Sequence, residues 1–171
     1  NYVLGRSTIT AVRELEVAAA VSPHRMDITE GLSVATTDGQ EVVVTMIDDA
    51  YNAKPDYMAD SFGAASSLWR DRRLVMVLGE MLELGEHSAE IHREVGVAVA
   101  AANPDVLITV GMGASPLQES VDATVAKFET EDSRGALGVL RGAVRSGDLV
   151  LLKGSYGSGV WEIANALRAT A

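Results

Sequence analysis

Cysteine is absent from the 171-residue sequence, and so are apolar runs near the length of a membrane span. The first absence excludes disulfides and thiolate chemistry and is compatible with a reducing cytosol. The second, together with the lack of a signal-peptide pattern at the start, predicts a soluble protein without membrane insertion. Positive charge is also scarce. The sequence has 14 Lys and Arg residues and 24 Asp and Glu residues, for a net charge of -10. This negative charge argues against sequence-independent binding to nucleic acid.

Short apolar runs alternate with longer segments in which apolar residues recur at helical spacing. Strands are expected at 42–47, 74–78, 106–110, 124–128 and 149–152. Helical patterns lie at 55–69, 91–102, 137–144 and 160–167. This alternation predicts right-handed βαβ units around a mostly parallel sheet. We therefore expect a three-layer α/β, Rossmann-like domain with a sheet of about six strands.

A hairpin is expected ahead of the first of these strands. Residues 26–30 alternate between apolar and polar side chains, and the turn signal at 37–39 returns the chain antiparallel into the strand at 42–47. The hairpin adds one antiparallel edge strand to the sheet. Its root carries Arg25, near the far end of the second strand, so Arg25 and Asp49 are expected to lie close together despite their separation in sequence.

An amphipathic helix is expected before the hairpin. Its apolar face is formed by Ile9, Val12, Leu15 and Ala19, and it ends before Pro23. No internal repeat, low-complexity tract or Pro/Ser-rich linker interrupts the rest of the chain. We interpret residues 1–22 as a lead-in helix and residues 23–171 as a single domain, which is long enough to bury a sizeable core.

Small or polar residues follow four of the predicted strands. These stretches are 48–52, 79–81, 111–115 and 153–155. Because the carboxyl ends of parallel strands share one edge of a sheet, the four loops together predict a binding rim. In the first stretch an apolar run stops at two carboxylates, Asp48 and Asp49. From position alone, a functional site and a capped strand end explain this pair equally well.

Two glycine-containing stretches give weaker signals. The stretch Gly111-Met112-Gly113 lacks the third glycine of a dinucleotide fingerprint and does not follow the first strand, which favours a tight turn. Residues 154–159 are rich in glycine, but the phosphate-loop pattern GxxxxGK[ST] occurs nowhere in the chain. We therefore expect no phosphate cradle in this domain.

Histidine and tryptophan side chains also have alternative interpretations. His87 and His92 lie among four glutamates, but they lack the i, i+4 spacing of a helical zinc site. A charged, solvated helix face explains them better than a metal site does. Trp69 and Trp161 both fall on predicted helices, and we interpret them as packing residues rather than stacking platforms.

Three motifs, in order along the chain, resemble the C-terminal domain of the Mur ligase family. They are IDDAYNAKP at 47–55, VMVLGEMLELGE at 75–86 and LLKGS at 151–155. His24-Arg25-Met26-Asp27 is similar to the arginine motif that opens this domain in the family. The tripeptide-forming member carries Asp-Tyr-Ala-His at the first motif, whereas the order here, Asp-Ala-Tyr-Asn, resembles the branch that adds D-alanyl-D-alanine.

The resemblance implies an ATP-dependent amide ligase of peptidoglycan synthesis. Such enzymes convert the carboxylate of UDP-MurNAc-tripeptide into an acyl phosphate, which the amine of D-alanyl-D-alanine attacks, while magnesium offsets charge on the phosphates. ATP and magnesium are held mainly by a central domain that this chain lacks, so the resemblance implies no catalytic residue and no metal site here, and no activity for the chain alone. It implies nucleotide binding by Arg25, Asp49, Tyr51 and Asn52. For the dipeptide it suggests Lys153 and Ser155.

The chain departs from the family's motifs at three positions. Lys54 replaces a second Asn, His24 stands where Gly often precedes the arginine, and Tyr156 occupies a position where Arg is common. Two alternative functions stay open at this point. One is a sister amide ligase such as folylpolyglutamate synthase, and the other is a non-catalytic Rossmann-like binding module.

Overall fold

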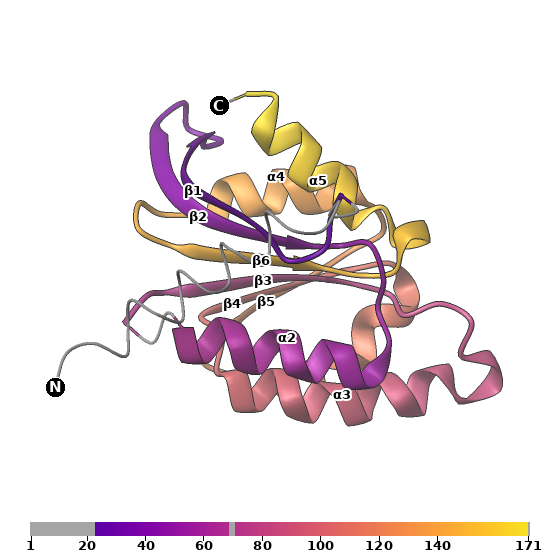
Figure 1. Cartoon of the computed structure of the whole chain (residues 1–171). Coiled ribbons are helices and arrows are strands. Elements are labelled where there is room, and N and C mark those ends of the chain that lie inside the picture. Colours follow the sequence, from indigo (N-terminus) through magenta and orange to yellow (C-terminus); the bar gives the residue numbers. More distant parts are fainter. Residues whose placement is uncertain (1–22, 69–70, 171) are drawn as a thin grey trace, which may run out of the picture.

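A six-stranded sheet forms the centre of the structure, a computed structural model that describes residues 23–68 and 71–170. Its spatial order is β1-β2-β6-β3-β4-β5 (Figure 1). Only β1 and β2 pair antiparallel, and all other neighbouring strands are parallel. The strands are β1 (Asp27–Ala35), β2 (Glu41–Asp49), β3 (Leu74–Gly79), β4 (Val106–Val110), β5 (Ala126–Thr130) and β6 (Leu149–Lys153).

Helices cover both faces of this sheet. In Figure 1, α4 (Ser133–Ala143) and α5 (Val160–Arg168) lie above it, and α2 (Pro55–Leu68) and α3 (Ser88–Ala102) lie below it. Three short 3-10 helices complete the elements, at Gly85–His87, Met112–Gln118 and Tyr156–Ser158. The three-layer α/β fold and its mostly parallel, six-stranded sheet are as predicted from the sequence.

Local sequence explains where these helices begin and end. Pro55 opens α2, where a missing backbone N–H costs no hydrogen bond. Asp132 caps α4 by accepting a hydrogen bond of 2.8 Å from the backbone N–H of Gly135. Asn103 ends α3 in the left-handed conformation, with a φ of 50°.

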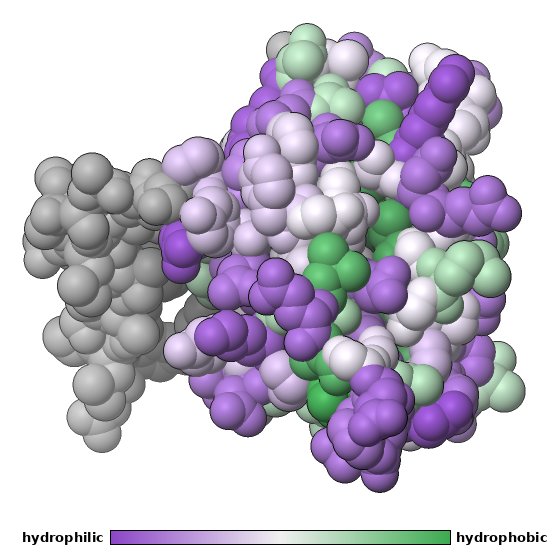
Figure 2. Space-filling view, turned by 90° about the vertical axis from the view of Figure 1, so that its right-hand side faces the viewer, coloured by the Kyte–Doolittle hydropathy of each residue, from purple (hydrophilic) through white to green (hydrophobic). Residues whose placement is uncertain are grey.

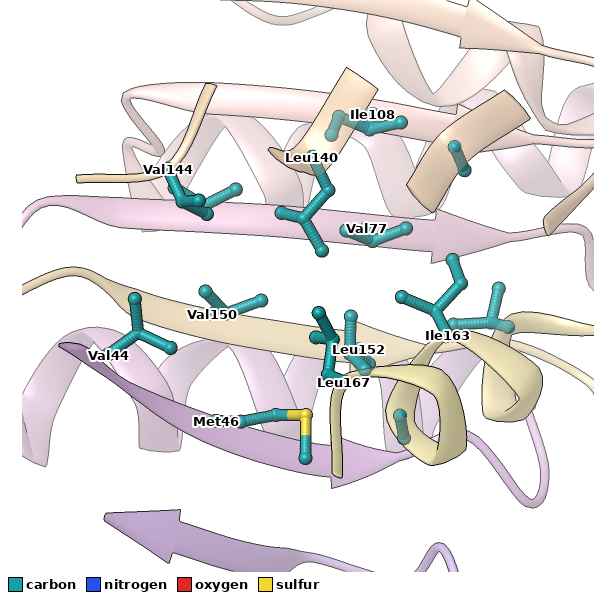
Figure 3. Packing of buried hydrophobic residues seen from close by; sticks show 14 of the residues in the cluster. Val44, Met46, Val77, Ile108, Leu140, Val144, Val150, Leu152, Ile163 and Leu167 are labelled. Carbon is teal, nitrogen blue, oxygen red and sulfur yellow. The ribbon is translucent and has the colours of Figure 1, made fainter. Parts of the chain in front are cut away.

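Each face of the sheet has its own hydrophobic core, because side chains alternate between the faces along every strand. Val44, Met46, Val150 and Leu152 pack under α4 and α5 against residues such as Leu140 and Leu167 (Figure 3). On the other face, Ile47, Met76 and Leu151 pack with Met58 and Phe62 of α2. The central strands β3, β4 and β6 are buried along their whole length, which is why they read as uninterrupted apolar runs.

The predicted hairpin is present, and its first strand is longer than expected. Asp27 pairs with Asp48 and Ala35 with Glu41, so β1 continues well beyond residue 30. The register shifts between Thr29 and Leu32, around Gly31, whose φ is 70°. This bulge lets the chain pass a glycine without leaving the sheet, which the simple alternation rule does not capture.

Other predicted elements differ from the structure only at their ends. The strand expected at 124–128 lies at 126–130. The helix expected within residues 1–22, and Trp69, lie outside the described residues. Of the helices in residues 23–68 and 71–170, none has the length and apolarity needed to cross a bilayer.

Candidate functional site

The carboxyl ends of β2, β3, β4 and β6 meet at one edge of the sheet, as predicted. Backbone hydrogen bonds join them: Glu80 N donates to Val110 O at 3.1 Å, and Ser155 N donates to Glu80 O at 3.3 Å. Gly79 permits this close approach, because an added Cβ would lie 2.7 Å from both Ser158 Cβ and Val160 Cγ2. Figure 2 faces this edge and shows an interrupted band of hydrophobic residues between hydrophilic ones.

Asp49 is the centre of a hydrogen-bond network at this edge. Its Oδ2 accepts from Lys153 Nζ at 2.6 Å and from Ser61 Oγ at 2.8 Å, and its Oδ1 accepts from Met26 N at 3.2 Å. Lys153 comes into reach because it is the register partner of Asp49 in the parallel β2/β6 pair. Three segments far apart in the sequence, around Met26, Ser61 and Lys153, therefore fix this one carboxylate.

Arg25 is presented by a tightly held turn. Its neighbours His24 and Met26 both have positive φ values, 65° and 49°, a conformation that costs non-glycine residues energy. The turn is held at His24 O, which accepts from Tyr51 N at 3.0 Å, and at Met26 N, which donates to Asp49. The guanidinium carbon of Arg25 lies 4.1 Å from the centroid of the Tyr51 ring, a cation–π contact.

Arg25 and Asp49 line one small pocket, as the hairpin geometry predicted. This pocket, which we call the Asp49 pocket, has a volume of about 270 Å³, and its walls include Arg25, Asp49, Tyr51, Asn52, Ser61 and Lys153. It offers an exposed cation, Arg25, beside a carboxylate that is mostly buried but still 14% exposed. That combination suits a ligand that carries both anionic groups and hydroxyl groups.

Asp48 points to the opposite face of the sheet and has a structural environment. It is fully buried, and its Oδ2 lies 2.7 Å from His24 Nδ1 and 2.8 Å from Arg168 Nη1. Arg168 also reaches Asp27 at 2.7 Å. Asp48 thus ties the end of α5 and the start of the hairpin to the sheet, whereas Asp49 lines the Asp49 pocket.

A second, larger pocket lies beside the first. This aromatic pocket has a volume of about 680 Å³, and the residues that line it include His24, Tyr51, Tyr156 and Trp161. Tyr156 and Trp161 are stacked, with centroids 5.0 Å apart and planes 6° apart. Ser155 contributes to its wall as well. Because Tyr51 and Asn52 line both pockets, they form the partition between them.

The profile of the family described as "Mur ligase, glutamate ligase domain" matches residues 24–156. The chain belongs to the Mur ligase family. The match begins at the residue before Arg25 and includes β1 to β6, so it contains both pockets' strand-end residues.

Curated Mur ligases resemble nearly the whole chain. The UDP-N-acetylmuramoyl-tripeptide--D-alanyl-D-alanine ligase of Mycobacterium tuberculosis (strain CDC 1551 / Oshkosh) is 35% identical over 96% of this chain. The ligase of the same name from Bacillus subtilis (strain 168) is 27% identical, also over 96%. The chain spans only 35% and 38% of the length of these two relatives.

Solved structures support the fold. The crystal structure of the MurF ligase of Thermotoga maritima in complex with ADP aligns with a TM-score of 0.66 and 22% identity, covering 95% of this chain and 36% of that one. A MurF structure from Acinetobacter baumannii aligns with a TM-score of 0.63 and 24% identity, over 89% of this chain and 31% of that one.

Most of the predicted site residues of this Mur ligase domain come together, but Lys153 and Ser155 separate. Ser155 Oγ accepts a hydrogen bond of 3.0 Å from Leu82 N and lines the aromatic pocket. Lys153 instead contacts Asp49 and Asn52 in the wall of the Asp49 pocket. The structure therefore groups Lys153 with the residues predicted to bind the nucleotide, and not with Ser155.

Sequence reasoning missed several contributors to the site. Ser61 lies three residues after Met58 on the buried side of α2, and a polar residue beside that apolar stripe was the available signal. Arg168 gave none, because only the packing of α5 brings it to Asp48. Trp161 packs against the core, as predicted, but its ring also stacks on Tyr156, so the interpretation as a packing residue alone is incomplete.

The interpretation of His92 as part of a solvated helix face is wrong. His92 is fully buried, its Nδ1 lies 2.7 Å from the carbonyl oxygen of Ser88, and its Nε2 accepts from Met81 N at 2.9 Å. It fastens the loop after β3 to α3. His87 is exposed beside Glu86 and Glu90, as expected of a charged surface.

Two further sequence interpretations concern metals and glycines. In the described ranges 23–68 and 71–170, no group of three or more His, Asp or Glu residues is arranged to hold a metal ion. Magnesium is usually held by one or two carboxylates together with the phosphates of the nucleotide, so a complete protein cage is not required for it. Gly111 has a φ of 92°, and its carbonyl oxygen accepts from Ala114 N at 3.1 Å, so this stretch is the tight turn that was predicted.

Proposed function

We propose that this chain is the C-terminal domain of an ATP-dependent ligase that adds D-alanyl-D-alanine to UDP-MurNAc-tripeptide in bacterial, cytoplasmic peptidoglycan synthesis. In this proposal residues 1–22 lead in from a preceding domain and residues 23–171 form the C-terminal domain. Curated relatives with this name align with 96% of the chain. The observation that carries the proposal is the convergence of Arg25 and Asp49 on one pocket at the carboxyl edge of the sheet.

The Asp49 pocket is the nucleotide side of the proposed site. A carboxylate that retains an unused acceptor position suits a ribose hydroxyl, which donates a hydrogen bond. The exposed guanidinium of Arg25 suits a phosphate, which accepts planar, charge-assisted hydrogen bonds. Tyr51 and Asn52 lie beside these groups and would contact the nucleotide. The donor set thus fits ATP, while the bulk of the ATP site and its magnesium belong to domains outside this chain.

Arg25 would act when this domain closes over ATP held by its neighbour. Negative charge moves within the triphosphate as the tripeptide carboxylate attacks the γ-phosphate and ADP leaves. A positioned guanidinium stabilises that charge. Because the turn around residue 25 is tightly held, Arg25 needs little rearrangement when the charge develops. The amine of the dipeptide then attacks the acyl phosphate, with release of inorganic phosphate and a proton.

The aromatic pocket is the candidate dipeptide side, through Ser155 on its wall. The hydroxyl of Ser155 already accepts from Leu82 N and has one O–H available to donate. A free dipeptide carboxylate can accept such a bond. Asn52 lines both pockets, so in this proposal it would lie between the two substrates.

The test of this function uses the full-length ligase of which we propose this chain is a part. Incubation with ATP, magnesium, UDP-MurNAc-tripeptide and D-alanyl-D-alanine should yield ADP, phosphate and a product whose mass has increased by the dipeptide minus water. Glutamate offered as the acceptor in a parallel reaction should give no product. Ligation of glutamate instead of the dipeptide would identify a sister ligase such as folylpolyglutamate synthase, and the absence of any ligation would favour a non-catalytic binding module.

The 171-residue chain by itself should not catalyse ligation. Given ATP, magnesium and both substrates, it is expected to release no phosphate above the rate of a buffer control, because the proposed site needs a second domain to hold the triphosphate. Phosphate release by this chain would contradict the division of labour proposed here. Restored activity on mixing it with separately produced remaining domains would support that division.

A further inference from the structure

Lys153 is one of the most deeply buried charged groups in the described part of the chain. Its side chain is 2% exposed, at the carboxyl end of the central strand β6. A buried ammonium group must be paired, because removing it from water is costly. Two partners satisfy it: Asp49 Oδ2 at 2.6 Å and the carbonyl oxygen of Asn52 at 3.1 Å.

These two partners, Asp49 and Asn52, both line the Asp49 pocket. Asp49 supplies the carboxylate of the Asp49 pocket, and Asn52 lies between this pocket and the aromatic pocket. One ammonium group therefore fixes a side chain and a backbone segment at the same time. Its position follows from the sheet order, which inserts β6 between β2 and β3 and makes Lys153 the register partner of Asp49.

The pairing with Lys153 leaves Asp49 few free acceptor positions. A carboxylate has about four lone-pair positions for hydrogen bonds. Lys153 Nζ donates to one position on Oδ2, and Ser61 Oγ lies 2.8 Å from the same oxygen, although its single hydroxyl hydrogen has Tyr57 O, also at 2.8 Å, as a second acceptor. Met26 N occupies one position on Oδ1. About one position, on Oδ1, is left for a ligand. The ammonium group thus fixes which oxygen faces the protein and which one is available to a hydroxyl.

We infer that Lys153 is a positioning residue for Asp49: it orients the carboxylate for the nucleotide and makes no contact with the acceptor dipeptide. This inference rests on the proposed function and replaces the expectation that Lys153 belongs to the dipeptide side. Ser155, two residues later, accepts a hydrogen bond from Leu82 N and lines the aromatic pocket. The two polar side chains at the end of β6 therefore lie in the walls of different pockets.

The test compares Lys153→Met with Arg73→Met in the full-length ligase. Arg73 is a matched control, because it also pairs with a buried carboxylate, Asp148, at 2.7 Å, but at the opposite ends of β3 and β6. Titration calorimetry gives the Kd for ATP, and steady-state kinetics give the KM for D-alanyl-D-alanine. Thermal unfolding of each variant measures the loss of stability that both substitutions share.

Lys153→Met is expected to raise the Kd for ATP by roughly tenfold or more. Without Lys153 the carboxylate of Asp49 is no longer oriented, so its charge-assisted hydrogen bond to the nucleotide is lost. The KM for the dipeptide should stay within about twofold of the unmodified enzyme, which is less than the effect of one lost hydrogen bond. Arg73→Met should lower the melting temperature without changing either constant. If Lys153→Met does not fold, Lys153→Gln, which keeps a donor for Asn52 O but no charge, takes its place.

Two outcomes overturn the inference. A raised KM for the dipeptide with an unchanged Kd for ATP would return Lys153 to the acceptor side. A loss of stability with neither constant changed would make the ion pair purely structural. Failure of the proposed function can be told apart from both outcomes. An enzyme that ligates a different acceptor still binds ATP, so the Kd for ATP can still be compared between Lys153→Met and Arg73→Met.

Discussion

Asp48 and Asp49 are neighbours in sequence and have opposite environments. Asp48 is fully buried on the α4/α5 face, where His24 and Arg168 pair with it. Asp49 lies on the α2 face, 14% exposed, where its carboxylate lines the Asp49 pocket. The pleat of β2 alone separates them, since consecutive side chains of a strand point to opposite faces.

Both carboxylates at the end of β2 hold the turn that precedes β1, each from its own face of the sheet. Asp48 holds the turn before β1, through His24, in the conformation that presents Arg25. Asp49 receives the other side of the same turn, through Met26 N. The φ of His24 is 65°, a conformation that glycine adopts readily and that strains a histidine. Here the contacts of the His24 ring with Asp48 and Trp161 help to offset the strain of that backbone conformation.

Replacing Asp48 should have the largest effect on folding. Asp48→Ala leaves His24 and Arg168 without their shared carboxylate, and we expect the free energy of unfolding to fall by about 3 kcal/mol. Denaturation by urea measures the change. Asp27→Ala is the matched control, because it removes the second, half-exposed partner of Arg168 and should cost less than about 1 kcal/mol. Equal losses in the two variants would contradict the structural role of Asp48.

Arg25→Ala should affect turnover and leave the fold intact. Arg25 is exposed, and its contact with Tyr51 contributes roughly 0.5–1 kcal/mol, so the melting temperature of the full-length ligase should change little. Turnover should fall by about a hundredfold if the guanidinium stabilises the transferring phosphoryl group. Arg25→Lys should recover part of it by restoring the charge. An unchanged kcat in Arg25→Ala would refute the proposed role.

Asp49→Asn separates binding from folding at the second carboxylate. The amide keeps an acceptor for Lys153 but loses its charge, so we expect the Kd for ATP to rise by roughly tenfold. The free energy of unfolding should fall by less than in Asp48→Ala, since Asp49 is partly exposed and retains hydrogen-bond partners. Calorimetry and urea denaturation on the same preparations compare the two effects. A larger loss of stability in Asp49→Asn would erase the distinction between the two residues.

The sequence predicted the fold well because its signals are local. Continuous apolar runs such as 74–78 and 106–110 mark buried parallel strands, and helical spacing marks the layers that cover them. The turn at 37–39 and the alternation after residue 26 predicted the hairpin, and with it the approach of Arg25 to Asp49. These features depend on neighbours in sequence and on the rule that parallel strand ends share an edge.

The contents of the site were harder to predict because they depend on strand order. The last strand, β6, lies between β2 and β3, and no local pattern specifies that position. Lys153 meets Asp49 only because of it. The burial of His92 likewise depends on the loop after β3 returning over α3, which places Met81 N against the imidazole. Long-range placement, rather than residue type, decided which polar side chains line the two pockets.

The smallest expected effect concerns Asp148, at the end of the sheet away from the pockets. Burial raises the pKa of this carboxyl above its ordinary value of 3.8, although Arg145 N and Arg73 oppose the shift. The folded state then binds a proton more readily than the unfolded state, so this group's contribution to stability is greatest below pH 3.8 and is lost as the pH rises through the folded pKa. Asp148→Asn removes that dependence. Subtracting its urea-denaturation free energies from those of the unmodified chain between about pH 3.5 and 7 should give a difference that falls with pH, by less than about 1.4 kcal/mol per pH unit. A difference that rises over this range would mean that Arg73 outweighs burial and lowers the pKa instead.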